Sequence, residues 1–154
     1  MDDVPAATTP AVGPLVRDRL ALLSTIAAGG AVGSLARWGL GQALGPWLGT
    51  TPAIPWATFT ANVTGCLLLG ALTVVLAERH PTSRRLRPFL GVGVLGGYTT
   101  FSTLMLEARD LFVSGRSGAA LLYVAASVVL GLAAVVTGMQ LARVLPSSRA
   151  AGTS

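Results

Sequence analysis

Apolar residues run through this chain in four long stretches, separated by short segments that carry most of the charged residues. The stretches cover residues 20–44, 55–77, 89–112 and 119–143. Each is long enough to meet the requirement of roughly 20 residues for a helix that crosses the hydrocarbon core of a bilayer. The pattern therefore predicts an all-α membrane protein with four transmembrane helices in residues 17–145, which leaves little room for a separate domain.

Composition agrees with this prediction. Of the 154 residues, 52% are hydrophobic and 11% are charged, and so few charges cannot cover the surface of a soluble globule. The first sixteen residues hold two aspartates among alanines, threonines and prolines, and they lack the basic start and apolar centre of a signal peptide. We expect residues 1–16 and 146–154 to be disordered tails.

All eleven cationic residues are arginines, and most lie near the ends of the predicted spans. Arginines at span ends anchor a helix to lipid headgroups, so we expect no nucleic-acid partner despite the basic composition. The single cysteine, Cys66, excludes an intrachain disulfide and a cysteine metal site. A chain without lysine also lacks the phosphate-binding loop of an ATPase, and we expect no enzyme activity.

The arginines are distributed unequally between the two sides of the membrane. With four spans, both termini share one side with the loop between the second and third spans, whereas Arg109 and Arg116 lie on the other. The first side carries eight arginines: Arg17, Arg19, Arg79, Arg84, Arg85, Arg87, Arg143 and Arg149. The positive-inside rule therefore predicts a plasma-membrane protein with both termini in the cytoplasm.

The third apolar stretch is interrupted at residues 96–103, which read Gly-Gly-Tyr-Thr-Thr-Phe-Ser-Thr. Backbone that leaves the helix at membrane depth is tolerated only where it is buried in protein or lines a wet cavity. We therefore predict that the third helix is broken over 96–103 and that a functional site lies there. The pair Gly29 and Gly33 in the first span favours close helix packing, although such pairs are common in membrane proteins.

Among the polar side chains inside the predicted spans, we single out Arg37, Thr58, Asn62, Tyr123 and Ser127. We expect the acidic residues nearest to the spans, Glu78, Glu107 and Asp110, to lie at or beyond span ends. Hydrogen-bond donors without central acids favour an anion over a cation or a proton relay. The alternatives are an interhelical hydrogen bond for Asn62, a bond to the preceding turn for Ser127 or Thr58, and snorkelling for Arg37.

Three motifs together resemble those of the Fluc (CrcB) family of fluoride channels, over residues 27–145. The motifs are Gly29-Gly30-xx-Gly33-xxx-Arg37, then Thr58-xxx-Asn62-xx-Gly65 with Gly70, then Gly96-Gly97-x-Thr99-Thr100-Phe101-Ser102-Thr103. The resemblance implies a four-span subunit of an antiparallel dimer, with two fluoride pathways at the interface and a structural sodium ion at its centre. It also implies passive fluoride efflux that lowers the cytoplasmic fluoride level.

The resemblance further implies site residues. The sodium ligands would be the backbone carbonyls of Gly96 and Thr99, as suits a hard cation. The fluoride pathway would include Asn62, Phe101, Thr103, Tyr123 and Ser127, with Thr58 and Leu104 beside them. Arg37 corresponds to the family's first-span arginine, which we expect to raise the local anion concentration at a vestibule.

One departure from the family pattern is Leu104, which stands where the pattern has a second phenylalanine. Residues 101 and 104 share a helix face, so each pathway of a homodimer would lack one aromatic edge. The strong arginine asymmetry also disfavours a chain that inserts in both orientations. Our hypothesis is a heterodimer with a related chain of opposite orientation; the alternative is a homodimer that tolerates Leu104.

Two other functions compete with the channel. A small proton-coupled exporter would require a carboxylate in the first span, and residues 20–44 contain none. A non-transporting scaffold or assembly subunit would use the polar residues only to join helices, which gives no reason for the break in the third span. Fluoride conduction accounts for the lack of a carboxylate in the first span and for the break in the third span.

Overall fold

The computed structural model describes residues 13–48, 54–79 and 85–144. All regular elements among these residues are helices, and none is a strand. The elements are α1 (Pro14–Leu48), α2 (Trp56–Arg79), the π-helix η1 (Pro88–Val94), α3 (Leu95–Tyr98), α4 (Phe101–Val113) and α5 (Ser117–Val144). Four segments are long and apolar enough to span a membrane: α1, α2, the unit η1–α3–α4, and α5. The predicted all-α fold with four spans is confirmed.

The first span is longer than the sequence pattern predicted. Helix α1 begins at Pro14, inside the predicted N-terminal tail, and ends at Leu48 rather than near residue 44. A proline suits the first helical position because its missing N–H has no intrahelical partner there. Residues 1–12 of the predicted N-terminal tail lie outside the described residues. The same holds for the predicted C-terminal tail, residues 146–154, and for the arginines at 84 and 149.

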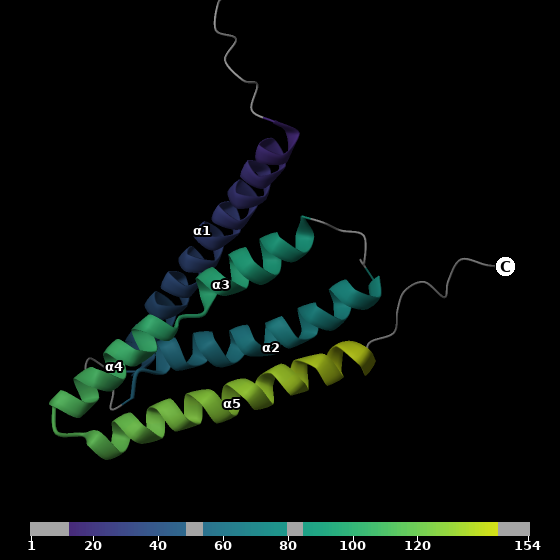
Figure 1. Ribbon diagram of the computed structural model, residues 1–154. Helices are drawn as coiled ribbons and strands as arrows, with labels where there is room; N and C mark the ends of the chain where they lie inside the picture. Colours follow the sequence, from purple (N-terminus) through teal and green to yellow (C-terminus); the bar gives the residue numbers. More distant parts are fainter. Residues whose placement is uncertain (1–12, 49–53, 80–84, 145–154) are drawn as a thin grey trace, which may run out of the picture.

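The spans associate as two pairs (Figure 1). Helix α1 lies along η1 and α3, whereas α2 lies along α5, and α4 covers the N-terminal part of α5. The N-terminal half of α1 stands apart from α2 and α5 in this view. The break in the third span therefore connects two different packing partners, α1 before it and α5 after it.

Glycines bring α1 against the first half of the third span, backbone to backbone. A methyl group on Gly33 would overlap the carbonyl oxygen of Val94, and one on Gly97 would overlap the carbonyl oxygen of Gly30. A methyl group on Gly29 would lie 2.5 Å from the carbonyl oxygen of Phe89. The predicted packing role of Gly29 and Gly33 is confirmed, because larger side chains would push the two helices apart.

Helices α2 and α5 use the same device. Gly70 of α2 leaves no space for a methyl group beside the carbonyl oxygen of Val135, and Gly138 of α5 leaves none beside that of Leu67. Close approach through small residues replaces the hydrophobic drive that lipid cannot supply. These contacts fix α2 and α5 as one unit.

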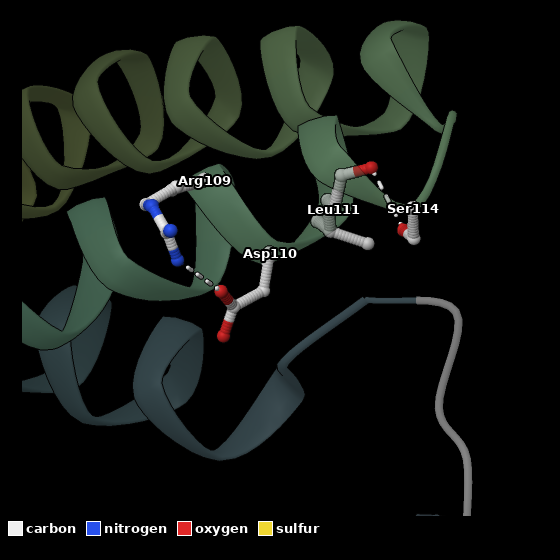
Figure 2. A network of polar contacts seen from close by, with 4 residues as sticks. All are labelled: Arg109, Asp110, Leu111 and Ser114. Atoms are coloured by element: carbon white, nitrogen blue, oxygen red, sulfur yellow. Dashed lines mark hydrogen bonds and ion pairs between the residues drawn. The ribbon is translucent and has the colours of Figure 1, made fainter.

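Helix α4 packs by side chains and ends in a capped turn. Its buried Leu104, Ala108 and Leu111 form a core cluster with Ala120 and Tyr123 of α5. The helix then ends in a Schellman motif, in which the N–H of Arg116 donates to the Leu111 carbonyl and the N–H of Gly115, at φ 79°, donates to the Phe112 carbonyl. Figure 2 shows the Ser114 hydroxyl folded back onto the Leu111 carbonyl, 2.9 Å away. This turn directs the chain into α5.

Candidate ion pathway

The break in the third span consists of two extended residues, Thr99 (φ −85°, ψ 155°) and Thr100 (φ −150°, ψ 124°). The predicted break over 96–103 was too wide. Gly96 and Gly97 still belong to α3, and Thr103 already belongs to α4. We predicted non-helical backbone at Gly96 and Gly97 because they are glycines. Gly97 is instead needed within the helix, for the close approach of α3 to α1.

Helix α4 restarts because Thr100 caps it. The Thr100 hydroxyl oxygen accepts a hydrogen bond from the Thr103 N–H at 3.3 Å, and it lies 3.0 Å from the Thr103 hydroxyl. An N-cap of this kind satisfies a backbone donor that the first turn of a helix leaves unpaired. The Thr103 hydroxyl, predicted to line the pathway, is therefore tied to the break itself.

Asn62 of α2 holds the break from the other side. Its Nδ2 donates to the Thr100 carbonyl at 2.9 Å, and its Oδ1 accepts from the Thr100 N–H at 2.8 Å. This reciprocal pair matches the interhelical hydrogen bond that was the structural alternative for Asn62. Gly65, one turn further along α2, leaves room for the Thr99 side chain, which a methyl group there would overlap.

Two carbonyls at the break fit a cation. Among the hydrogen bonds between described residues, none ends on the carbonyl oxygens of Gly96, Tyr98 or Thr99, whereas those of Leu95, Gly97 and Thr100 accept bonds. In the same part of the chain no three His, Cys, Asp or Glu side chains gather into a metal site. Backbone oxygens freed by a helix break are ligands that a hard cation such as sodium accepts.

A groove of about 330 Å³ opens beside the break, and we call it the break groove. Its lining includes Asn62, Gly96, Thr99, Phe101, Leu104 and Ser127. Phe101 and Leu104, which share a helix face in the sequence pattern, differ in burial. Phe101 is 73% exposed, and Leu104 is 3% exposed. Leu104 belongs to the core of the chain, whereas the Phe101 ring is largely exposed.

A second set of predicted residues meets on a carboxylate, Glu107 of α4. The Thr58 hydroxyl donates to Glu107 Oε1 at 2.8 Å, and the Tyr123 hydroxyl donates to Oε2 at 2.7 Å. Tyr123 is 1% exposed, within the core cluster. Ser127 donates to the carbonyl of Tyr123 in the preceding turn at 2.7 Å, as its structural alternative predicted.

The predicted place of Glu107, at or beyond a span end, was wrong. The third span covers Pro88–Val113, and the Glu107 side chain contacts residues of α2 and α5 inside the bundle. A helical projection could have found it, because Glu107 lies only about 60° around the helix from Leu104, beside the face of α4 that contacts α5. Distance along a span does not report on direction around the helix.

Arg37 of α1 is turned toward the protein. Its Nε donates to the Gly97 carbonyl at 3.3 Å. Arg37 also borders a cavity of about 360 Å³ between α1 and α2, the α1–α2 cavity, with Ser34, Trp38, Gln42 and Thr58 in its lining. Arg37 therefore connects this cavity to the end of α3, and the residue is half-buried.

Comparison with known proteins bears directly on this site. Residues 24–139 match the family described as "CrcB-like protein, Camphor Resistance (CrcB)". The match includes α2, the break and most of α5. The chain belongs to the CrcB-like family. It is a multi-pass membrane protein with four spans, as the apolar pattern predicted.

Relatives of this CrcB-like chain carry a common name. A protein of Nocardia farcinica named "Fluoride-specific ion channel FluC 2" is 48% identical over 124 residues, which cover 80% of this chain and 86% of that protein. "Fluoride-specific ion channel FluC" of Nitrobacter winogradskyi is 45% identical over 120 residues, covering 78% and 94%. "Fluoride-specific ion channel FluC 2" of Thermobifida fusca is 47% identical over 118 residues, covering 74% and 82%.

Proposed function

We propose that this chain is a subunit of a fluoride channel in the plasma membrane, which conducts fluoride passively out of the cell and so lowers the cytoplasmic fluoride level. The names of relatives at 45–48% identity support this function. Conduction down a gradient involves no chemical step, and we expect no enzyme activity.

The observation that carries the proposal is the clamped break at membrane depth. Asn62 uses both its donor and its acceptor to hold Thr100 in an extended conformation. Extended backbone inside a membrane is costly unless it serves a cavity, and the break groove is such a cavity. Phe101 borders the groove, and the positive rim of its ring suits an anion that must later leave.

We further propose that two subunits associate in antiparallel orientation across the break groove. Phe101 is largely exposed in a single chain, and a partner would cover it. The Gly96 and Thr99 carbonyls would hold a structural sodium ion at this interface. A bound cation would supply positive charge beside these carbonyl dipoles.

The donors of the proposed pathway are engaged within the chain. Thr58 and Tyr123 donate to Glu107. Fluoride and a carboxylate compete for the same hydroxyl donors, because both are anionic hydrogen-bond acceptors. Passage of fluoride therefore requires these hydroxyls to release Glu107, and we propose that Glu107 holds the pathway closed between ions.

Orientation and partner choice follow from the charge pattern. We propose that both termini lie in the cytoplasm, since the arginines gather on that side. A single dominant orientation disfavours an antiparallel homodimer. The heterodimer with a related subunit of opposite orientation remains our hypothesis, and that partner would supply the aromatic edge that Leu104 lacks.

One observation favours the second candidate, a non-transporting assembly subunit. Every buried side-chain nitrogen or oxygen atom in the described residues has a hydrogen-bond partner. Polar residues satisfied in this way can serve only to join helices. A scaffold nevertheless gives no reason for an open groove at the break.

Reconstitution of the purified chain alone into liposomes tests the proposal. Vesicles loaded with fluoride are monitored by a fluoride electrode, chloride-loaded vesicles serve as the control, and chemical crosslinking reports on the dimer. Fluoride efflux without chloride efflux supports a self-sufficient channel. Efflux only after addition of a related subunit supports the heterodimer, and no efflux with either arrangement supports the assembly subunit.

A further inference from the structure

The end of α3 leaves carbonyl groups without helical partners at membrane depth. Because Thr99 and Thr100 are extended, the carbonyls of Gly96, Gly97 and Tyr98 lack the usual donors four residues ahead, whereas that of Leu95 still accepts from the Thr99 N–H. Carbonyls in apolar surroundings require other partners. The direction of each carbonyl decides whether it can bind a cation or already accepts a hydrogen bond within the protein.

Helix α1 binds one of these carbonyls, that of Gly97. Arg37 Nε donates to it at 3.3 Å, and the Ser34 hydroxyl lies 3.5 Å from it. Both side chains reach it because Gly97 lies directly against Gly30, which precedes Ser34 by one turn. Gly30, Ser34 and Arg37 thus form a single face of α1 that is in contact with the end of α3.

The carbonyl of the preceding residue, Gly96, lies on a different side of α3 from that of Gly97. Successive residues of a helix are displaced by about 100° around its axis, and Gly96 borders the break groove whereas Arg37 and Ser34 border the α1–α2 cavity. When the Gly97 carbonyl is held toward α1, Gly96 is turned toward the groove. The rotation of α3 about its axis decides both contacts at once.

The charge of Arg37 strengthens this arrangement. The C-terminal end of a helix carries partial negative charge, which a nearby cationic side chain stabilises. The guanidinium group is planar and donates from Nε to this carbonyl, and Arg37 also borders the α1–α2 cavity. A neutral side chain of the same length would offer neither the charge nor this geometry.

We propose that Arg37 is a positioning residue for the cation site: it holds the Gly97 carbonyl, and thereby fixes the orientation in which the Gly96 carbonyl faces the break groove. This inference rests on the sodium site of the proposed function. It differs from the vestibule role implied by the family resemblance, in which Arg37 attracts the anion. Ser34 acts in the same direction with a weaker contact.

The test is the sodium dependence of thermal unfolding of the purified full-length chain. Sodium replaces a large organic cation at constant ionic strength, and the melting temperature is followed in wild type, Arg37→Gln, Arg37→Lys and Ser34→Ala. Arg109→Gln is the matched control, because Arg109 is an exposed arginine whose partner is Asp110 (Figure 2). A ligand that binds only the folded state raises the melting temperature in proportion to its affinity.

We expect Arg37→Gln to raise the sodium concentration for half of the stabilisation by roughly tenfold. Arg37→Lys should recover most of this loss, since an ammonium group also donates to a carbonyl. Ser34→Ala should shift the midpoint in the same direction by a smaller factor, and Arg109→Gln should match wild type. Ser34→Ala and Arg37→Lys keep the test valid if Arg37→Gln does not fold.

Equal sodium midpoints in wild type and all Arg37 variants would overturn the proposal, and so would a wild-type melting temperature that does not respond to sodium either in the chain alone or together with the related subunit. A sodium response that depends on Arg37, in a chain that gives no fluoride efflux either alone or with a related subunit, would contradict the proposed channel while supporting the positioning role. Fluoride efflux with no effect of Arg37 on the sodium midpoint would do the reverse.

Discussion

The two halves of the third span are held in place by opposite means. Before the break, η1 and α3 contact α1 through glycines, with backbone against backbone at Gly33 and Gly97. After the break, α4 contacts α5 through buried side chains and through the hydrogen bonds of Glu107. The first half is therefore sensitive to added atoms, and the second half is sensitive to removed atoms.

This difference explains how two residues can remain extended between them. A helix that is fixed on both sides of a break cannot straighten to absorb Thr99 and Thr100 without losing one set of contacts. The clamp by Asn62 then needs to supply only the local hydrogen bonds. Single substitutions in the two halves should therefore lower the free energy of unfolding by different amounts.

Substitution Gly33→Ala should have the largest effect. The added methyl group overlaps the Val94 carbonyl oxygen and lies 2.8 Å from the Tyr98 nitrogen, so backbone must move. We expect a loss of about 3 kcal/mol or more in the free energy of unfolding, the upper end for overpacking. The matched control is Gly30→Ala, whose methyl group meets no atom within 4 Å. Equal unfolding curves for the two variants would contradict the backbone contact.

Substitution Leu104→Ala tests the second half. Leu104 lies in the core cluster, and its truncation leaves a cavity against Tyr123. We expect a loss of about 2–3 kcal/mol, measured by denaturant unfolding in detergent micelles. Leu106→Ala serves as the control, since that side chain is 56% exposed and its loss should change stability by less than about 0.5 kcal/mol.

Substitution Glu107→Gln should have a smaller effect on stability and a larger one on conduction. The glutamine keeps one acceptor oxygen for Thr58 or Tyr123, so we expect a loss of about 1 kcal/mol. Removal of the negative charge should increase fluoride efflux several-fold, because the hydroxyls are released more readily to the anion. Slower efflux from a stably folded variant would show that Glu107 does not hold the pathway closed.

Substitution Asp110→Asn should have the smallest effect and serves as the control for Glu107. Asp110 lies one turn later on α4, and its partner Arg109 is 3.2 Å away with both side chains largely exposed (Figure 2). Exposed ion pairs contribute between 0 and about 1 kcal/mol. Unfolding and efflux should both match wild type, and a change as large as that of Glu107→Gln would point to a general effect of charge on α4.

The number of spans could be predicted from the sequence because the length of an apolar run is a direct consequence of membrane thickness. The position of the break could be predicted only roughly. Glycines and threonines both signalled it, but Gly96 and Gly97 lie in the helix and only Thr99 and Thr100 leave it. Residue types limit the conformations that a backbone can adopt, and the contacts with α1 decide which of them Gly96 and Gly97 adopt.

The candidate site was predicted in its members but not in its connections. Asn62, Thr58, Tyr123 and Ser127 were identified, and each lies at or near the break or the core cluster. Glu107 was missed because its position along the span was weighed without its direction around the helix. A carboxylate that binds two of the predicted hydroxyls could be found only once α2, α4 and α5 were placed together.

The most direct test of the account is fluoride efflux from liposomes with wild-type chain beside liposomes with Asn62→Ala, each with chloride-loaded controls. With the wild-type chain, reconstituted alone or together with the related subunit of a heterodimer, the account predicts fluoride-selective efflux. In the same arrangement the variant should lose at least roughly tenfold, which corresponds to about 1.4 kcal/mol, in protein that remains folded. Equal fluoride efflux from both, or equal release of chloride, would contradict a conduction pathway built around the clamped break.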